Sequence, residues 1–259
     1  MKLGLEGRTA LVCASSDGLG KACALSLARE GCTVIINGRD ADRLQTAAEQ
    51  IRGETDAKVT PVQADLNTVE GREALCRTAQ GASILVNNNA GPAPGNFQDF
   101  EREDWEHALE ANFYAPLFMI KAMLPGMRAR RFGRIVNITS ARVKSPTPTM
   151  TLSTAPRAGV TALVRALALD IAVDNVTINN LLPERFATQR QVEMAERISK
   201  EQGIDRESAM KVIAETIAAK RLGRPEEFGD TCAFLCSVQA GYISGQNLQL
   251  DGGSYRGLI

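Results

Sequence analysis

A glycine-containing turn near the N-terminus is the first feature of the sequence that could support chemistry. Residues 14–21 have the sequence ASSDGLGK and follow a short apolar run at 8–13. Gly18 and Gly20 stand where a helical pattern begins, and their missing side chains would let a ligand approach the first turn of that helix. Free N–H groups and the helix dipole favour an anion there. The turn therefore indicates a binding site for a phosphate or a pyrophosphate, such as that of a dinucleotide.

A second group of polar residues follows the next apolar run, at 33–36. Dinucleotide sites of this type use an acid here for the ribose 2′-hydroxyl of NAD, or an arginine nearby for the 2′-phosphate of NADP. Residues 37–40 are NGRD, and the planar guanidinium of Arg39 suits a phosphate. The sequence thus favours NADP(H) over NAD(H), with Asp40 as the N-cap of the following helix. The alternative is that Arg39 is a solvated turn residue.

Strand and helix patterns alternate along the chain, as in consecutive βαβ units. The strand runs are largely apolar, which is typical of strands buried on both faces of a parallel sheet. Right-handed crossovers then give an α/β fold of the Rossmann type, a doubly wound parallel sheet of about seven strands with helices on both faces. The predicted strands are 8–13, 33–36, 58–63, 84–87, 134–139, 176–182 and 246–250. The predicted helices are 18–29, 41–52, 70–79, 105–130 and 154–173.

One segment, residues 184–221, departs from this alternation. It is charged and helical in pattern, contains no strand run, and predicts two helices that meet near 202–204. Because it follows the carboxyl end of a strand, it would lie where a lid over a ligand crevice lies. A solvated helical excursion is the alternative. No linker rich in Pro, Gly or Ser divides the sequence, so we expect residues 1–259 to form a single domain with this lid-like insertion.

Composition excludes several other classes of protein. Lys plus Arg and Asp plus Glu each number 30, so no net charge draws the chain to nucleic acid or to an anionic membrane. We expect no transmembrane helix and no signal peptide, because no apolar stretch of the sequence is long enough. Six scattered cysteines and a single histidine predict no metal site. They suit small buried thiols in a cytoplasmic protein.

From residue 5 to residue 253, the sequence resembles the short-chain dehydrogenase/reductase family. Gly18 and Gly20 match the last two glycines of the family's Thr-Gly-x-x-x-Gly-x-Gly turn. The first glycine of that turn is Ala14 here, and its threonine is Cys13. Alanine is the smallest possible change, so the resemblance still implies a dinucleotide site.

Further motifs extend the resemblance. Asp65 matches the family's adenine-contacting aspartate, and the NNNAG stretch at 87–91 matches its Asn-Asn-Ala-Gly segment with a register ambiguous by one residue. Pro183 and Thr188 match the segment beside the nicotinamide, although Glu184 replaces a family glycine. The resemblance implies cofactor binding by Ala14, Ser16, Asp17, Gly18, Leu19, Gly20, Arg39, Asp65, Leu66, Asn88, Ala90, Gly91, Arg157, Pro183 and Thr188.

At the catalytic positions the family pattern is altered. The resemblance implies hydride transfer between a nicotinamide and a carbonyl or alcohol. Ser140 matches the serine that polarises the carbonyl, and Asn112 matches the asparagine that supports a proton-relay water. The family's tyrosine position is Ser153, and its lysine position is Arg157. No tyrosine lies between positions 114 and 242, so a shift of register does not restore the pair.

The proton donor therefore stays open at this stage. A serine hydroxyl is a weaker acid than a phenol, and an arginine stays charged and donates protons poorly. Three sources are considered: a water held by the four catalytic-position residues, Lys144 with a depressed pKa, or an acid brought by a substrate or partner. Ser153 also has a structural interpretation as a helix N-cap, with Pro156 just inside the helix start.

The resemblance favours an NADP(H)-dependent oxidoreductase similar to 3-oxoacyl-[acyl-carrier-protein] reductases, acting on a small-molecule or acyl-carrier carbonyl substrate with a non-standard proton donor. The alternative is a catalytically impaired dinucleotide-binding protein that serves as a sensor or partner subunit. The helices predicted after residue 105 and residue 154 are apolar around much of their circumference and need a cover. Since family members pair such helices, we expect a homo-oligomer, a tetramer or a dimer.

Overall fold

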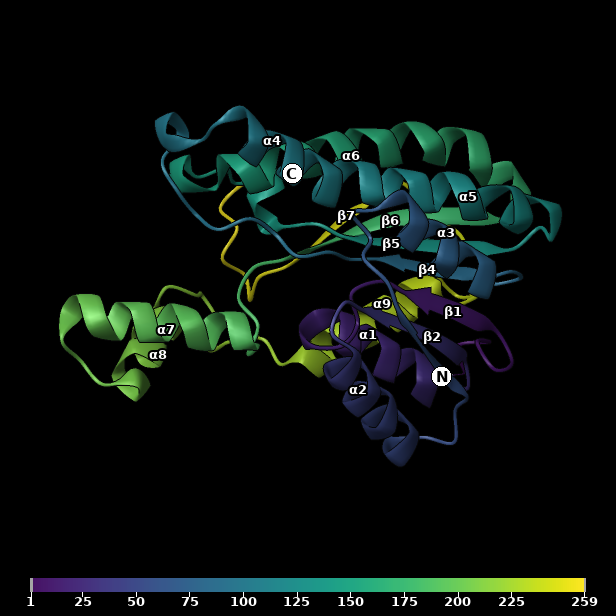
Figure 1. Cartoon of the computed structure of the whole chain (residues 1–259), viewed down its shortest axis with the longest axis horizontal. Helices are drawn as coiled ribbons and strands as arrows, with labels where there is room; N and C mark the ends of the chain where they lie inside the picture. The colour runs from purple at the N-terminus through teal and green to yellow at the C-terminus, as the bar shows by residue number, and fades with distance from the viewer. Residues whose placement is uncertain (1, 259) are drawn as a thin grey trace.

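A computed structural model describes residues 2–258, and its centre is a seven-stranded parallel sheet in the order β3-β2-β1-β4-β5-β6-β7 (Figure 1). This is the predicted fold class, and each strand begins and ends within two residues of its predicted position. The strands are β1 (Thr9–Val12), β2 (Thr33–Gly38), β3 (Val59–Gln63), β4 (Ile84–Asn87), β5 (Gly133–Ile138), β6 (Val176–Pro183) and β7 (Asn247–Leu250).

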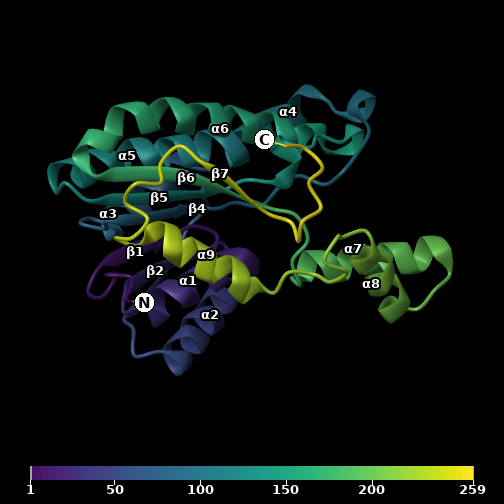
Figure 2. The same ribbon diagram turned by 180° about the vertical axis from the view of Figure 1, so that it is seen from behind.

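Two layers of helices cover the two faces of the sheet (Figures 1 and 2). One layer contains α1 (Gly18–Arg29), α2 (Ala41–Glu54) and α9 (Pro225–Cys236), and the other contains α3 (Val69–Thr78), α5 (Ala115–Ala129) and α6 (Thr151–Ile171). Alternate strand residues serve alternate cores: Val12 packs with the first layer and its neighbour Leu11 with the second. This explains why the strand runs are apolar throughout, since each side chain is buried on one face or the other.

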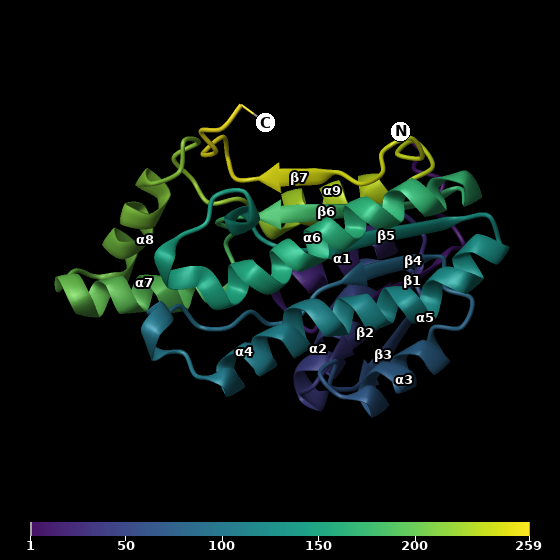
Figure 3. The ribbon, with the colours of Figure 1, turned by 90° about the horizontal axis from the view of Figure 1, so that it is seen from above.

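The order of the sheet places a crevice at its carboxyl edge. From β1 the chain crosses to β2 and β3 on one side, and from β4 it continues to β5 on the other. Loops that leave β1 and β4 therefore diverge, and ligands of such sheets bind at this switch point. Figure 3 shows the strand arrows of β6 and β7 pointing to the end of the molecule where α7 and α8 lie.

The helix predicted at 105–130 is instead three consecutive segments. The chain forms α4 (Arg102–Leu109), a π-helical turn (Glu110–Tyr114) and α5. Pro116 has no N–H to donate to the carbonyl of Asn112, four residues earlier. Instead the N–H of Ala115 donates to the carbonyl of Glu110, five residues back. The predicted helical stretch is thus present with one irregular turn in it, and that turn carries Asn112, a predicted site residue.

The predicted insertion contains two helices, as expected. They are α7 (Gln189–Gln202) and α8 (Arg206–Glu215), and Gly203 separates them in the left-handed conformation (φ +66°). A small cluster of Ala195, Ala209 and Ile213 holds the two helices together. The pair projects from the sheet and its covering helices in all three views (Figures 1 to 3).

Short helical turns complete the described elements. They are the 3₁₀ segments Phe97–Asp99, Ala141–Val143, Pro148–Met150 and Ala172–Asp174. Among residues 2–258, no helix is both long enough and apolar enough to cross a membrane.

Candidate cofactor and active site

A cleft with a volume of about 360 Å³ lies at the carboxyl edge of the sheet, within the range of small-molecule sites. Its lining includes most of the residues that the resemblance assigned to cofactor binding. These are Ala14, Ser16, Asp17, Gly18, Leu19, Arg39, Asp65, Leu66, Asn88, Ala90 and Thr188. Gly20, Gly91, Arg157 and Pro183 are not part of this lining.

The turn after β1 is held in a conformation that suits glycine. Ala14, at the position of the family's first glycine, has φ +43°, and its N–H donates to Oδ1 of Asn37 at 3.1 Å. A Cβ on Gly20 would lie 2.3 Å from the carbonyl oxygen of Ala14. Gly20 is therefore required for the close approach of α1 to this turn, which explains why it does not line the cleft.

The start of α1 keeps its N–H groups available for a ligand. Asp17 is the N-cap residue, but its carboxylate accepts no capping hydrogen bond, and the first turn of the helix has no acidic residue. The N–H groups of a first helical turn have no partner within the helix. Together with the helix dipole, they fit a dinucleotide pyrophosphate.

The end of β2 carries a positive charge, and Gly38 there lies close against the turn after β1. A Cβ on Gly38 would lie 3.0 Å from Oγ of Ser16. Asp40 accepts a hydrogen bond from the N–H of Arg43 at 2.9 Å, so it caps α2 as predicted. Arg39 is exposed and lines the cleft. This edge of the cleft suits the 2′-phosphate of NADP better than a bare ribose hydroxyl.

Ser153 and Arg157 lie one helical turn apart inside α6. Nη1 of Arg157 donates to Oγ of Ser153 at 2.6 Å, and both side chains are buried. The helix begins at Thr151 with Met150 as its N-cap residue, so the interpretation of Ser153 as an N-cap was wrong. The position of Pro156 differs from that interpretation for the same reason, because it lies in the second turn of the helix rather than at its start.

A small cavity with both polar and apolar lining lies beside Arg157. Its volume is about 20 Å³, which is room for roughly one water. Arg157, Asn112 and Thr139 line it, and Leu66, Asn88 and Asn89 line both this cavity and the larger cleft. Burial, and to a smaller extent the charge of Arg190, lowers the pKa of Arg157 to about 10. The guanidinium is therefore still a cation at neutral pH.

Ser140 follows β5 as predicted, and its hydroxyl oxygen accepts one hydrogen bond from the backbone. Its Oγ accepts a hydrogen bond from the N–H of Arg142 at 3.1 Å. The hydroxyl proton is consequently free to point elsewhere, for example to a carbonyl oxygen. Lys144, considered above as a proton donor, has its Nζ 5.4 Å from the centroid of the Tyr255 ring. The structure thus places Lys144 against the C-terminal segment.

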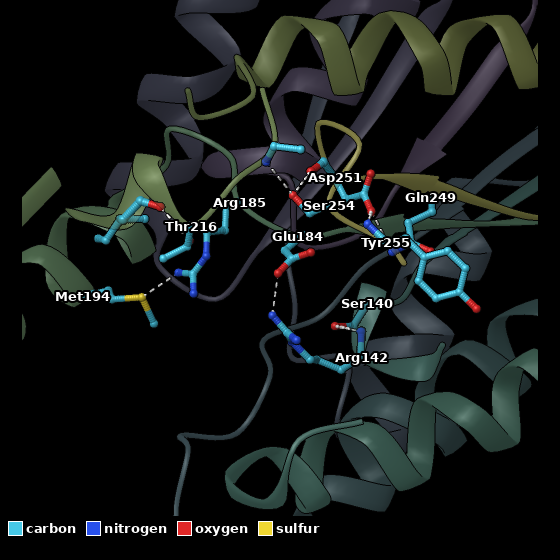
Figure 4. A network of polar contacts seen from close by, with 12 residues as sticks. Ser140, Arg142, Glu184, Arg185, Met194, Thr216, Gln249, Asp251, Ser254 and Tyr255 are labelled. Atoms are coloured by element: carbon cyan, nitrogen blue, oxygen red, sulfur yellow. Dashed lines mark hydrogen bonds and ion pairs between the residues drawn. The ribbon is translucent and has the colours of Figure 1, made fainter. Parts of the chain in front are cut away.

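An ion pair that the sequence analysis did not find connects the loop after β5 with the end of β6. Nη2 of Arg142 lies 2.6 Å from Oε1 of Glu184. Figure 4 shows the Arg142 side chain reaching Glu184, with Ser140 beside it. The two partners are far apart in the sequence, so no local spacing indicates the contact. The one available signal was an acid at a position where the family has glycine.

A row of four asparagines, three of them buried and the last half-buried, crosses the sheet near the site and was also missed. Asn87 of β4 donates to Asn137 of β5, Asn137 to Asn180 of β6, and Asn180 to Asn247 of β7, at 2.8–3.2 Å. Since each amide both donates and accepts, the row satisfies polar groups that would otherwise be costly to bury. It fixes the mutual register of the strands that carry Ser140 and Pro183.

Comparisons with known proteins agree with this geometry. Residues 13–255 match the family model described as enoyl-(acyl carrier protein) reductase. The chain is 31% identical to the NADPH-dependent reductase BacG of Bacillus subtilis (strain 168) over 98% of this chain and all of that protein. Its fold superposes on L-sorbose reductase from Gluconobacter frateurii, crystallised with NADPH and L-sorbose, with a TM-score of 0.95 and 29% identity over the whole of both chains. A 3-oxoacyl (acyl-carrier-protein) reductase from Agrobacterium tumefaciens C58, with NADP bound, gives 0.88 and 30% identity, covering 97% and 96% of the two chains.

Proposed function

The chain belongs to the short-chain dehydrogenase/reductase family, and on that premise we propose that it is an NADP(H)-dependent reductase of a small-molecule or acyl-carrier carbonyl compound. The observation that carries the proposal is that two sites adjoin. The cleft that bears Arg39 shares its wall with the cavity that bears Arg157. A dinucleotide whose phosphate end contacts Arg39 would thus present its other end near Arg157 and Thr139, the residue that precedes Ser140.

When bound, NADPH supplies the hydride for the carbonyl carbon while a proton reaches the oxygen, giving the alcohol and NADP⁺. Ser140 donates a hydrogen bond from its hydroxyl to the carbonyl oxygen and orients the substrate. Arg157 stabilises the negative charge that develops on that oxygen. Ser153 accepts a hydrogen bond from Arg157, which leaves its own O–H free to donate.

The proton source that we favour is a water relay through Ser153. The cavity beside Asn112 and Arg157 has room for one water, and the carbonyl of Asn112 receives no hydrogen bond from Pro116. Such a water can restore the proton of the Ser153 hydroxyl after each turnover. The relay replaces the function of the family's tyrosine and lysine.

A non-catalytic role is the second candidate, favoured by one observation. By the resemblance, Ser153 and Arg157 stand at the family's tyrosine and lysine positions, while the residues predicted for the cofactor line a cleft. A sensor or partner subunit would need the cleft alone. It would bind NADPH and reduce no carbonyl compound.

The first experiment is a titration of the protein with NADPH and with NADH, followed by nicotinamide fluorescence. A charge-assisted hydrogen bond contributes about 1.5–3 kcal/mol, so Arg39→Ala should weaken NADPH binding roughly tenfold to hundredfold and leave NADH binding nearly unchanged. Arg43→Ala, which removes an exposed arginine from the first turn of α2, is the matched control. If neither cofactor binds the wild-type protein, the proposed function is wrong.

A further inference from the structure

The hydroxyl of Ser140 is connected to the end of β6 through a single residue. The backbone N–H of Arg142 donates to Oγ of Ser140 at 3.1 Å, and Nη2 of the same arginine lies 2.6 Å from Oε1 of Glu184. One residue thus binds the hydroxyl with its main chain and the carboxylate with its side chain, as Figure 4 shows.

The turn that follows Ser140 is joined to the rest of the chain by few polar contacts. It is the 3₁₀ segment Ala141–Val143, and Ser140 is its N-cap residue. Within the described chain, the N–H groups of residues 143–145 donate to the carbonyls of Ser140 and Ala141, which belong to the turn itself. These bonds shape the turn but do not join it to the sheet. The buried side chain of Ala141 and the ion pair of Arg142 hold it in place.

Glu184 is anchored at the other end of this connection. It directly follows β6, and its N–H donates to the carbonyl of Leu250 in β7 at 3.1 Å. The side chains of Arg142 and Glu184 are 24% and 19% exposed, so water and salt screen their attraction less than that of a surface pair. The neighbouring Arg185 is directed elsewhere, since its Nη1 donates to Sδ of Met194 at 3.0 Å. The carboxylate of Glu184 is therefore a fixed point at the sheet edge to which Arg142 binds.

The acid at position 184 stands where the family pattern has glycine. A glycine has no carboxylate to bind Arg142, so the family pattern does not provide this connection. In the proposed function, Ser153 and Arg157 stand in for the family's tyrosine and lysine, and Ser140 orients the substrate carbonyl. The place of its hydroxyl is then critical, because a misplacement of about 1 Å can lower a rate roughly a hundredfold.

We propose that Arg142 and Glu184 are positioning residues of the reductase, whose ion pair holds the turn after β5 so that the Ser140 hydroxyl faces the substrate carbonyl. The proposal rests on the proposed function and adds two residues to it. The pair acts through Ser140 and takes no part in the transfer of the hydride or the proton. Loss of the carboxylate should therefore slow the reaction at saturating substrate and leave the affinity for NADPH unchanged.

Hydrogen–deuterium exchange tests the first step without turnover. Exchange in peptides that contain residues 140–145 is measured by mass spectrometry for the wild-type protein and for Glu184→Gln, which keeps the side-chain shape and removes the charge. We expect exchange in this segment to become about tenfold faster, as the loss of a hydrogen bond between charged groups implies. Glu227→Gln is the matched control, because it breaks the ion pair with Arg221 at the start of α9. It should leave residues 140–145 unchanged.

Steady-state kinetics test the second step. NADPH oxidation is followed with a panel of ketones, 3-oxo esters and ketoses, and kcat and KM are measured for the compound that the wild-type protein reduces fastest. Values of kcat are expressed per NADPH-binding site, titrated by nicotinamide fluorescence, so that unfolded protein does not count. Glu184→Gln should lower kcat about tenfold to hundredfold and change the Kd of NADPH by less than a factor of roughly two. Glu227→Gln should keep the wild-type kcat.

Variants of the arginine show whether the pair acts as a unit. Arg142→Gln should lower kcat as much as Glu184→Gln does, and the double variant should lose no more than either single one, because both changes break the same contact. Arg142→Lys, which keeps a positive charge opposite Glu184, should retain more activity than Arg142→Gln.

Several outcomes would overturn the proposal while the reductase remains. Unchanged exchange in Glu184→Gln would show that the ion pair does not hold the turn. Faster exchange with a wild-type kcat would show that the order of the turn does not position Ser140. A rise in KM alone, or additive losses in the double variant, would show that the two side chains bind the substrate separately. A wild-type protein that reduces no compound of the panel would instead refute the proposed function, whatever the exchange of residues 140–145.

Discussion

At the scale of single residues, the turn after β1 contains the clearest local conflict between sequence and backbone. Ala14 has φ +43°, in a region that L-residues with a Cβ disfavour by about 1–2 kcal/mol. Hydrogen bonds on both sides hold it there: its N–H donates to the Asn37 side chain, and the next N–H, of Ser15, donates to the Asn37 carbonyl. The strain is thus retained at the edge of the cofactor cleft.

The substitution Ala14→Gly should stabilise the protein. Glycine adopts this conformation freely, and the gain exceeds its larger entropy in the unfolded chain, so we expect the free energy of unfolding to rise by roughly 0.5–1 kcal/mol. Urea denaturation measures it. Ala24→Gly, in the interior of α1, is the control and should destabilise by about 1 kcal/mol. A loss of stability in Ala14→Gly would contradict the strain argument.

The activity should fall at alkaline pH, because the site needs the positive charge of Arg157. Its pKa is about 10, mainly because of burial, so the cation that the site needs is lost as the pH rises through that value. We expect kcat/KM for an accepted carbonyl substrate to fall with an apparent pKa near 10. Steady-state kinetics in buffers spanning this pH, on both the wild-type protein and Lys144→Met, provide the measurement. Persistence of the fall in Lys144→Met assigns it to Arg157, and its disappearance would assign it to the lysine.

Loss of stability does not explain such a fall. The pKa of Arg157 is lower in the folded protein than the ordinary value of an arginine in the unfolded chain. Between these two values the unfolded chain binds more protons than the folded one, so the contribution of Arg157 to stability increases with pH. The guanidinium therefore destabilises the fold at neutral pH, as is common for groups retained for function.

At the scale of elements, the row of asparagines from β4 to β7 connects strand pairing with the position of the loop that carries Ser140. Asn137 is 1% exposed and makes two of the side-chain contacts in the row. We expect Asn137→Leu to lower the free energy of unfolding by about 2–4 kcal/mol, because a donor of Asn87 and an acceptor of Asn180 are left buried without partners.

Denaturant unfolding is again the measurement for Asn137→Leu. The control is Asn247→Leu, which removes one contact at the half-buried end of the row, and its loss should be clearly smaller. Equal losses in the two variants would show that the row acts as separate pairs and that burial does not set the cost.

The elements also show how far the sequence determines this structure. Parallel strands buried on both faces have unbroken apolar runs, so the positions of these runs along the sequence locate the strands. The π-helical turn was missed although Pro116 signals it, because the apolar pattern continues across it. The pair Arg142–Glu184 and the meeting of Arg157 with Arg190 depend on how distant segments approach one another. No periodicity within the sequence contains that information.

At the scale of the whole molecule, apolar side chains remain exposed on the helical layer of α5 and α6. Leu169 and Val173 are 73% and 71% exposed, and Tyr114 and Phe118 are 40% and 41% exposed. Figure 3 shows α5 and α6 lying side by side across the sheet, with the first pair near the end of α6 and the second near the start of α5. A second copy related by a two-fold axis would place one pair against the other.

Another apolar surface lies at the edge of the sheet. β7 has no neighbouring strand on its outer side within the described chain, and Leu248, Val238 and Tyr242 are exposed near it. Native proteins ordinarily cover or blunt such an edge. Two separate self-complementary surfaces on one chain generate a tetramer with three mutually perpendicular two-fold axes.

We therefore predict a homotetramer, with a mass four times the 27.9 kDa of one chain by light scattering coupled to size-exclusion chromatography. Leu169→Glu should yield a dimer, because a carboxylate placed in the α5 and α6 surface cannot be buried without a partner. Val212→Glu, at an exposed position of the projecting helix α8, is the control and should leave the tetramer intact. A monomeric mass for the wild-type protein would refute the prediction. If the wild-type protein and Leu169→Glu are both dimers, the α5 and α6 surface forms no interface and the edge at β7 forms the dimer.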